Sequence, residues 1–179
     1  MSSSDRGYRI SRRAGIRGLA AALVAGMLGA CTVQPLYGPA AGGGTVQSTL
    51  TRIAIAPVKD RVSQQVRNNV LFQLTGGKTV GDPLYRMKLT VTSREVGLGI
   101  TNIDSSPVFS VRLAATYEVT NIASGEQLVR GTARTSASYN RSNQAFANTR
   151  AKIDAENRAA AEAAREISTR VAAAVAAGS

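Results

Sequence analysis

The alternation of hydrophobic and polar residues changes several times along the chain, and each change marks an expected element of secondary structure. Ile53 and Ile55 alternate with smaller or polar residues until Pro57, which predicts a short strand. From residue 58 the hydrophobic residues recur at every fourth position, and glycines at 76 and 77 end the pattern. This is the period of an amphipathic helix, so we expect one helix directly after the first strand.

Three further stretches alternate with period two and predict three longer strands. These stretches are residues 85–92, 109–120 and 129–139. Residues 121–125 predict a tight hairpin turn between the second and third of these strands. Residues 97–107 predict a polar loop between the first and second. Gly131 lies inside the last stretch and indicates a bulge or a bend in that strand.

Residues 144–176 have a helical period throughout, and we expect a helix of roughly 50 Å there. Its hydrophobic stripe recurs at every seventh residue from Phe146 to Ala174 and is mostly alanine, which lets the helix lie close to its partner. The expected element order is β-α-β-β-β-α. This order predicts an α+β fold, a two-layer sandwich in which a four-stranded, mostly antiparallel sheet has two helices on one face.

The first thirty residues have a pattern typical of an exported lipoprotein. Five arginines precede an uncharged run from Gly18 to Ala30, as in a secretory signal. This run is too short for a helix that crosses a bilayer, which needs about 20 residues. Leu28-Gly29-Ala30-Cys31 resembles a bacterial lipobox, in which the cysteine is acylated and becomes the first residue of the mature protein. We therefore expect residues 1–30 to be a signal peptide and Cys31 to be lipidated.

Removal of this leader changes both the charge and the expected location. The net charge of the chain is +11, but residues 1–30 hold five arginines and one aspartate, so the mature protein has a net charge of +7.

Acyl chains on Cys31 would anchor the mature protein stably in a membrane, because each buried CH₂ contributes about 0.8 kcal/mol. Thr32 stands where Asp would favour the inner membrane, so we expect the periplasmic side of the outer membrane. Residues 31–49 then form the acylated cysteine and a flexible tether, and 50–179 the folded domain.

The composition excludes most catalytic and metal chemistry. The chain has no histidine, and Cys31 is its only cysteine, which leaves no usual general base, zinc site or internal disulfide. Gly77-Lys78-Thr79 imitates the end of a phosphate-binding loop, but Phe72 occupies a position where that loop needs glycine. The carboxylates of the last helix have arginines nearby, as on a solvated face. We expect neither an enzyme nor a cofactor.

One group of charged residues stands out. If one sheet face packs on the helices, the other has seven basic residues, opposed on these strands mainly by Glu118. The seven are Arg52, Arg86, Lys88, Arg94, Arg112, Arg130 and Arg134. Arginine binds phosphate through a planar fork, so this face suits an anionic partner. The alternative is ordinary solvated charge that protects the strand edges.

The sequence also limits which class of anionic partner is expected to bind this face. Nucleic acid is not expected, because the lipobox places the basic face outside the cytoplasm and the face lacks aromatic residues on which bases would stack. Lipid phosphate, another polymer of the cell envelope or an acidic protein surface would satisfy the same charge. The residues alone leave these three open.

Four segments of the chain have a distinctive sequence. They are Cys31-Thr32-Val33-Gln34-Pro35-Leu36-Tyr37-Gly38, Ile53-Ala54-Ile55-Ala56-Pro57, residues 61–69 and Tyr85-Arg86-Met87-Lys88-Leu89. These segments resemble the LptE family of lipopolysaccharide-assembly lipoproteins in its alphaproteobacterial form. The resemblance implies a protein without catalysis that lies as a plug inside the outer-membrane β-barrel LptD. It also implies help in folding that barrel and binding of lipopolysaccharide during insertion into the outer leaflet. The basic face would then meet lipid A phosphates or the inner wall of the barrel.

Two other classes of protein stay open at this point. An auxiliary lipoprotein of an ABC-type lipid transporter shares a lipobox and a small α+β domain. A periplasmic enzyme would have to build its site from Asp, Glu, Tyr and Lys, with Asp104 and Glu118 as residues to test. The identity of a co-purifying partner separates the first class from the LptE family.

Overall fold

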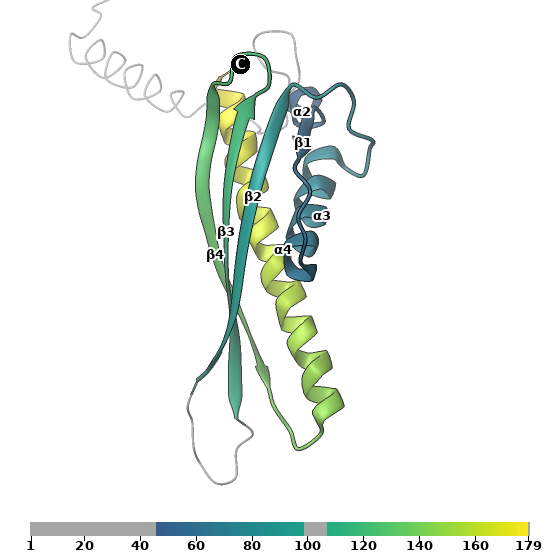
Figure 1. The fold of residues 1–179 in the computed structure, drawn as a ribbon, viewed down its shortest axis with the longest axis vertical. Helices are drawn as coiled ribbons and strands as arrows, with labels where there is room; N and C mark the ends of the chain where they lie inside the picture. The colour runs from purple at the N-terminus through teal and green to yellow at the C-terminus, as the bar shows by residue number, and fades with distance from the viewer. Residues whose placement is uncertain (1–45, 99–106, 179) are drawn as a thin grey trace, which may run out of the picture. The chain divides into compact units, whose positions relative to one another are not determined.

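A computed structural model of the chain describes residues 46–98 and 107–178. The predicted signal peptide, Cys31, most of the predicted tether and most of the 97–107 loop lie outside these residues. The described elements follow in chain order (Figure 1). They are α2 (Val46–Leu50), β1 (Ile53–Ile55), α3 (Arg61–Thr75), β2 (Tyr85–Gly97), β3 (Val108–Asn121), β4 (Gln127–Asn140) and α4 (Ala145–Ala177).

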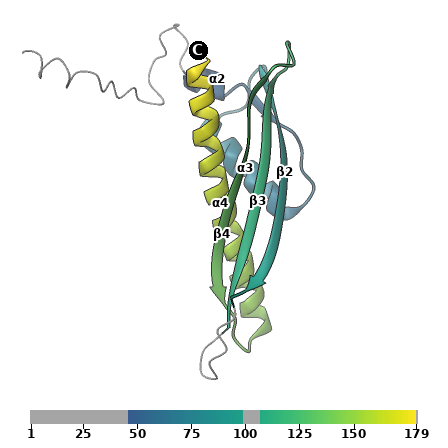
Figure 2. The same cartoon turned by 90° about the vertical axis from the view of Figure 1, so that its left-hand side faces the viewer.

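The four strands form one sheet in the order β1-β2-β3-β4. β1 is parallel to β2, and the other two pairings are antiparallel. The helices α3 and α4 lie together on one face of this sheet, and no helix of the described residues covers the other face (Figures 1 and 2). The predicted α+β sandwich with a mostly antiparallel sheet and two helices on one face is confirmed.

The short helix α2 was not expected from the sequence. Its five residues lie mostly within the predicted tether, yet Val46 and Leu50 are almost fully buried. The Gln47 side-chain amide donates a hydrogen bond to the carbonyl of Leu74, 3.1 Å away, and so ties α2 to the end of α3. A single helical turn is too short to show a period, which is why the sequence pattern did not predict α2.

Local interactions set both ends of α3. Asp60 caps the first turn, because its carboxylate accepts a hydrogen bond from the backbone N–H of Ser63 at 2.9 Å. The Ser63 hydroxyl also donates a hydrogen bond to this carboxylate, and the bonds from the hydroxyl and the N–H of Ser63 lower the pKa of Asp60 below its usual value. Gly76 ends the helix in the left-handed region at φ +63°, where glycine has no steric penalty. Within α3, Val66, Val70 and Leu74 are buried against the sheet layer, as the four-residue spacing predicts.

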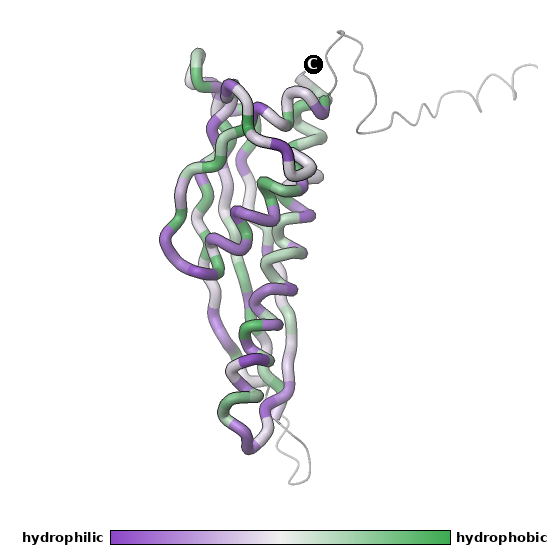
Figure 3. Tube along the Cα trace, turned by 90° about the vertical axis from the view of Figure 1, so that its right-hand side faces the viewer, coloured by the Kyte–Doolittle hydropathy of each residue, from purple (hydrophilic) through white to green (hydrophobic). Residues whose placement is uncertain are grey.

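The long helix α4 packs through small side chains. Six alanines of this helix are at most 1 % exposed, so α4 lies close to α3, β3 and β4. They are Ala155, Ala159, Ala160, Ala163, Ala164 and Ala172. Hydrophilic and hydrophobic segments alternate along α3 and α4 (Figure 3), as expected for helices packed on one side only.

The predicted hydrophobic stripe of α4 is only partly buried. Phe146 is 79 % exposed and Ile153 is 36 % exposed, because the first turns of α4 extend beyond the first turn of α3 (Figure 1). Despite its 33 residues, α4 is not hydrophobic enough to cross a bilayer, and neither is any other helix within the described ranges.

Gly131 has a different role from the predicted bulge or bend. The irregularity between β3 and β4 lies at Val119 and Thr120, whereas Gly131 pairs regularly with Tyr117. A Cβ atom at Gly131 would lie 2.7 Å from the Tyr117 hydroxyl oxygen. Tyr117 is almost fully buried, so glycine is needed at position 131 because only glycine leaves room for the phenol ring.

Candidate functional site

Strand alternation divides the residues of β2 between the two faces of the sheet. Met87 and Leu89 are buried beneath the helices, whereas Arg86, Lys88 and Arg94 are exposed on the uncovered face. The same parity places Arg112 on β3 and Arg130 and Arg134 on β4 on this face. Six of the seven predicted basic residues therefore share one surface, which we call the basic face. These six are Arg86, Lys88, Arg94, Arg112, Arg130 and Arg134.

Arg52 has a structural partner of its own. It precedes β1, and its Nε donates a hydrogen bond to the carbonyl of Asp82 at 3.0 Å. Its own carbonyl accepts bonds from the N–H groups of Leu84 and Tyr85. Arg52 thus holds the connection that leads into β2.

Three arginines of the basic face lie together. Arg94 on β2 is directly opposite Arg112 on β3, and Arg134 on β4 is opposite Ala114, two residues further along β3. With Thr92, Ser136 and their neighbours they line a shallow depression of about 400 Å³. We call Arg94, Arg112 and Arg134 the arginine triad.

No residue within the described ranges neutralises the arginine triad. The ion pairs found among residues 46–98 and 107–178 involve none of its three guanidinium groups. Like charges directly opposite each other on neighbouring strands destabilise a sheet. Among the described residues, the triad therefore has no ion pair that would offset this repulsion.

The upper part of the basic face is more balanced. Glu118 on β3 is opposite Lys88 on β2 and Arg130 on β4, so one carboxylate lies between two cations. The hydroxyls of Thr116 and Thr132 share a hydrogen bond of 3.0 Å beside this row. These threonine side chains are short, so they rise less far from the sheet than the charged side chains around them.

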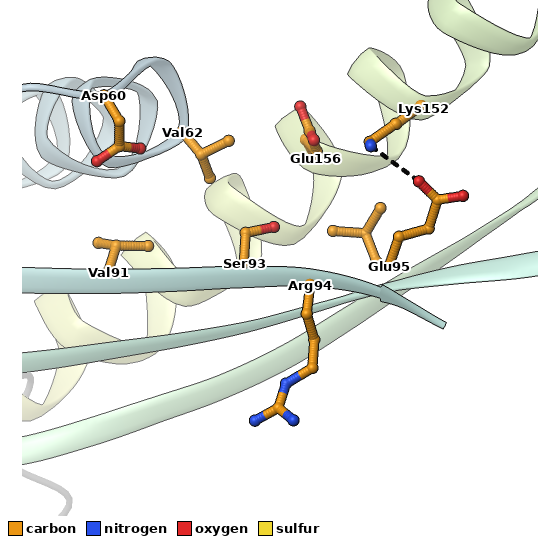
Figure 4. A pocket seen from close by; sticks show the side chains of 9 residues that line it. Asp60, Val62, Val91, Ser93, Arg94, Glu95, Lys152 and Glu156 are labelled. Carbon is orange, nitrogen blue, oxygen red and sulfur yellow. Dashed lines mark ion pairs between the residues drawn. The ribbon is translucent and has the colours of Figure 1, made fainter. Parts of the chain in front are cut away.

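A second polar cluster lies on the opposite, helix-covered side of the sheet. Glu95 accepts hydrogen bonds from the Tyr139 hydroxyl at 2.8 Å and from Arg141 at 2.6 Å, and it forms an ion pair with Lys152 at 2.8 Å (Figure 4). The Glu95 side chain is only 17 % exposed. We call these four residues the Glu95 cluster, and it ties β2 to β4 and α4.

The protonation states of the Glu95 cluster are those of a structural ion pair. The hydrogen bond from Lys152 lowers the pKa of Glu95, and the same bond raises the pKa of Lys152. Burial and the Glu95 carboxylate raise the pKa of Tyr139. Each shift moves the group away from neutral pH, so none of them is suited to acid–base catalysis. Sequence reasoning missed this cluster, although Glu95 is an acid at an inward position of β2.

A pocket of about 370 Å³ lies next to this cluster, between β2, the start of α3 and α4 (Figure 4). Val62, Val91 and Val111 form its hydrophobic part. Each of its carboxylates has a partner. Asp60 caps α3, Glu95 binds Lys152, and Glu156 pairs with Arg61. Across the described part of the chain, no group of His, Cys, Asp and Glu residues is arranged to hold a metal ion.

The comparison with protein families decides the family of the chain. Residues 50–171 match the family described as LptE, lipopolysaccharide-assembly, and this span includes all four strands. The chain belongs to the LptE family. LptE proteins are assembly lipoproteins and not enzymes, so the triad and the pocket are to be understood as binding or structural features.

Solved structures of bacterial lipoproteins share the fold of this chain. A protein of Caulobacter crescentus CB15 described as a lipoprotein is 23 % identical, with a TM-score of 0.64 over 75 % of this chain and 97 % of its own. A minor lipoprotein of Acinetobacter baumannii is 14 % identical, with a TM-score of 0.53 over 68 % of this chain and 88 % of its own. The rare lipoprotein B of Shewanella oneidensis, also 14 % identical, has a TM-score of 0.50 over 68 % and 92 %. A comparison with curated protein sequences finds no match.

Proposed function

We propose that this LptE-family protein binds lipopolysaccharide through the basic face, with the arginine triad as the centre of the contact. The observation that supports this proposal is the triad itself. Its three arginines lie on adjacent strands of an uncovered sheet and have no carboxylate partner within the described ranges. The family role in lipopolysaccharide assembly gives the ligand, which is an anionic glycolipid.

The geometry of the triad suits an anionic headgroup. Neighbouring strands are about 4.8 Å apart, so guanidinium groups on three strands can surround one phosphate or carboxylate. Ala114 lies between Thr92 and Arg134 on the neighbouring strands and lets an anion approach the sheet closely. Each arginine can donate two parallel hydrogen bonds to such a group. Binding by this surface is expected to weaken with added salt.

The proposal also includes anchoring at the outer membrane and a partner. Residues 1–30 would be removed as a signal peptide, and acyl chains on Cys31 would hold the protein on the periplasmic side. From Cys31 to Val46 a flexible tether would have a typical end-to-end distance of roughly 20 Å, so the folded part would stay close to the membrane. The partner is the β-barrel LptD, inside which the folded part would act as a plug and assist barrel folding.

The test of ligand binding reverses the charge of the triad. The variant Arg94→Glu, Arg112→Glu, Arg134→Glu is expected to bind lipopolysaccharide at least about tenfold more weakly than wild type, which is about 1.4 kcal/mol. The matched control applies the same charge change away from the basic face. It is Lys59→Glu, Lys78→Glu, Arg150→Glu, at three exposed positions. Equal weakening in both variants would show that net charge alone attracts the glycolipid and would refute a specific role for the triad.

The partnership is tested by co-purification. C-terminally tagged protein is isolated from outer membranes in mild detergent, and the proteins that accompany it are identified by mass spectrometry. A large β-barrel in stoichiometric amount is the expected result. Subunits of an inner-membrane lipid transporter, or no partner at all, would overturn the plug assignment.

A further inference from the structure

Among the strands that the structure describes, none lies beside one side of β2 over most of its length. β1 pairs only with Tyr85–Met87, and the last backbone bond on that side runs from the Ala56 N–H to the Met87 carbonyl. Between Leu89 and Gly97 no strand of the described chain lies on this side of β2. We call this stretch the open edge (Figure 1).

Every second residue of the open edge directs its backbone N–H and C=O groups away from β3. The N–H of Leu98 bonds the carbonyl of Val108, and the β2–β3 register is regular from Tyr85 to Gly97. In an antiparallel pair only every second residue bonds a given neighbour, so even-numbered residues of β2 bond β3. The odd-numbered residues therefore direct their N–H and C=O groups to the open side. These residues are Leu89, Val91, Ser93, Glu95 and Gly97.

The edge strand on the other side of the sheet, β4, has a helix beside it. The helix α4 lies along β4, and its Arg158 donates a hydrogen bond to the β4 carbonyl of Ser138 at 2.9 Å. The open edge of β2 has no such helix contact to its backbone among the described residues, and it contains no proline and no bulge. It is a template on which another strand can form.

The pocket described above lies beside this open edge. Val91 and Ser93 line it from β2, and Val62 and Val111 complete its hydrophobic part. Figure 4 shows Ser93 and Glu95 on the helix side of β2, whereas Arg94 points to the opposite face. A strand added at the open edge would direct every second side chain toward this pocket, which at about 370 Å³ accommodates a side chain of valine or leucine size.

The remaining side chains of an added strand would face the cations of β2. Lys88 and Arg94 are exposed on the basic face, one near each end of the open edge. Cross-strand neighbours of opposite charge stabilise a pairing, and neighbours of like charge oppose it. On the basic face, the edge therefore favours acidic side chains of an added strand over basic ones. A second copy of β2 would bring Lys88 and Arg94 close to their own equivalents, so it is disfavoured as the occupant.

We propose that the open edge binds an extended acidic segment of a partner protein, which adds to the sheet as a strand beside β2. Acidic side chains of the segment face Lys88 and Arg94, and a hydrophobic side chain enters the pocket. Backbone hydrogen bonds to the odd-numbered residues of β2 give the affinity, and the pocket and the two cations give the specificity.

The probe for this proposal is a capped, fluorescently labelled peptide of sequence Glu-Val-Glu-Val-Glu-Val-Glu. Its pattern is the same in both chain directions, so it can pair in parallel or antiparallel orientation. We expect it to bind the full chain, purified in mild detergent, and to raise its fluorescence anisotropy. A twin peptide N-methylated on every backbone amide has the same charges but cannot donate ladder hydrogen bonds, so it is expected to bind at least about tenfold more weakly.

Hydrogen exchange locates the contact. Binding of the probe is expected to slow exchange of the amides of Leu89, Val91, Ser93 and Glu95 and to leave those of β4 unchanged. Equal binding of the two peptides would reduce the effect to attraction by the basic face and overturn the proposal. Protection on β4 alone, or no binding up to about 1 mM peptide, would overturn it as well.

A pair of variants at one position supplies an independent control. Ser93→Pro removes an outward N–H without removing a hydrogen bond to β3, and it is expected to weaken peptide binding at least about tenfold. Ser93→Ala keeps this N–H and is expected to bind within about twofold of wild type. Thermal unfolding checks that both variants are folded. If Ser93→Pro does not fold, the comparison of the two peptides with the wild-type chain still decides the question.

Discussion

Replacing Gly131 by alanine tests the contact between β4 and the buried ring of Tyr117. The added Cβ would lie 2.7 Å from the tyrosine oxygen and 2.9 Å from the ring carbon Cζ, whereas carbon atoms in good contact are about 3.5–4.0 Å apart. Because Tyr117 is 1 % exposed, the ring has little room to move. Gly131 is not in the left-handed region, so the steric overlap is the main unfavourable effect.

The overlap opposes a smaller stabilising effect. Gly→Ala lowers the entropy of the unfolded chain and stabilises by about 0.4–1 kcal/mol, whereas overpacking a core costs about 1–3 kcal/mol. We expect a net loss of about 1.5 kcal/mol and a Tm lower by about 6 °C, since 1 kcal/mol corresponds to a few degrees in a unit of this size. Gly81→Ala is the matched control, because a Cβ there would meet nothing within 4 Å.

A double-mutant cycle identifies the cause of the loss. Tyr117→Leu removes the ring, so Gly131→Ala is expected to be at least about 1 kcal/mol less damaging in that background than in wild type. The free energy of unfolding is measured by urea denaturation for the four members of the cycle. A loss for Gly131→Ala that is the same in both backgrounds, or no loss at all, would refute the assignment of Gly131 as the residue that makes room for Tyr117.

Two further perturbations concern the ionic contacts. Glu95→Gln is expected to destabilise the protein by about 2 kcal/mol at pH 7, because Lys152 and Arg141 lose a charged partner in a mostly buried site; urea denaturation measures it. The pKa of Glu95 is lowered from 4.5 on folding, so its contribution is present above about pH 4.5 and is lost as the pH falls through the folded pKa. Wild type is therefore expected to lose more stability than Glu95→Gln between pH 6 and pH 3, and parallel pH profiles would contradict the ion pair. Asp60→Ala removes the cap of α3 and is expected to cost about 1 kcal/mol of unfolding free energy, whereas Asp60→Asn retains most of it.

Most of the fold was predictable because its elements are periodic over many residues. The strand alternation on either side of Arg112 and the spacing of Val62, Val66 and Val70 set the faces that pack, and both patterns agree with the structure. The short helix α2 was not predictable, since Val46 and Leu50 alone show no period. The exposure of Phe146 was missed for another reason. Helical period tells which side of α4 is hydrophobic, but it does not tell how far α3 extends along that side.

The sequence pattern predicted which face of the sheet has the basic residues, but not which of these residues lie next to each other. Alternation predicted seven basic residues on one side of the sheet, but the register between strands decides which of them lie next to each other. Because Arg94 aligns with Arg112 while Lys88 aligns with Glu118, one part of the face is unneutralised and another is balanced. The Glu95 cluster depends in addition on Lys152 of α4, and a contact between a strand and a helix 57 residues later in the chain leaves no local signal.

Arg112 allows the ligand-binding and the ordinary solvated interpretations of the basic face to be separated. It lies on a central strand directly opposite Arg94, so Arg112→Thr removes a repulsion and introduces a residue with high strand propensity. We expect the free energy of unfolding to rise by about 0.5 kcal/mol at low salt and the gain to shrink at high salt. Lipopolysaccharide binding is expected to fall at the same time, because the triad loses its middle member. A variant that is more stable but binds the glycolipid less well is the outcome expected when charge is kept on a surface for a ligand and not for folding. If Arg112→Thr binds lipopolysaccharide as tightly as wild type, Arg112 does not contribute to binding. The basic face is then ordinary solvated surface.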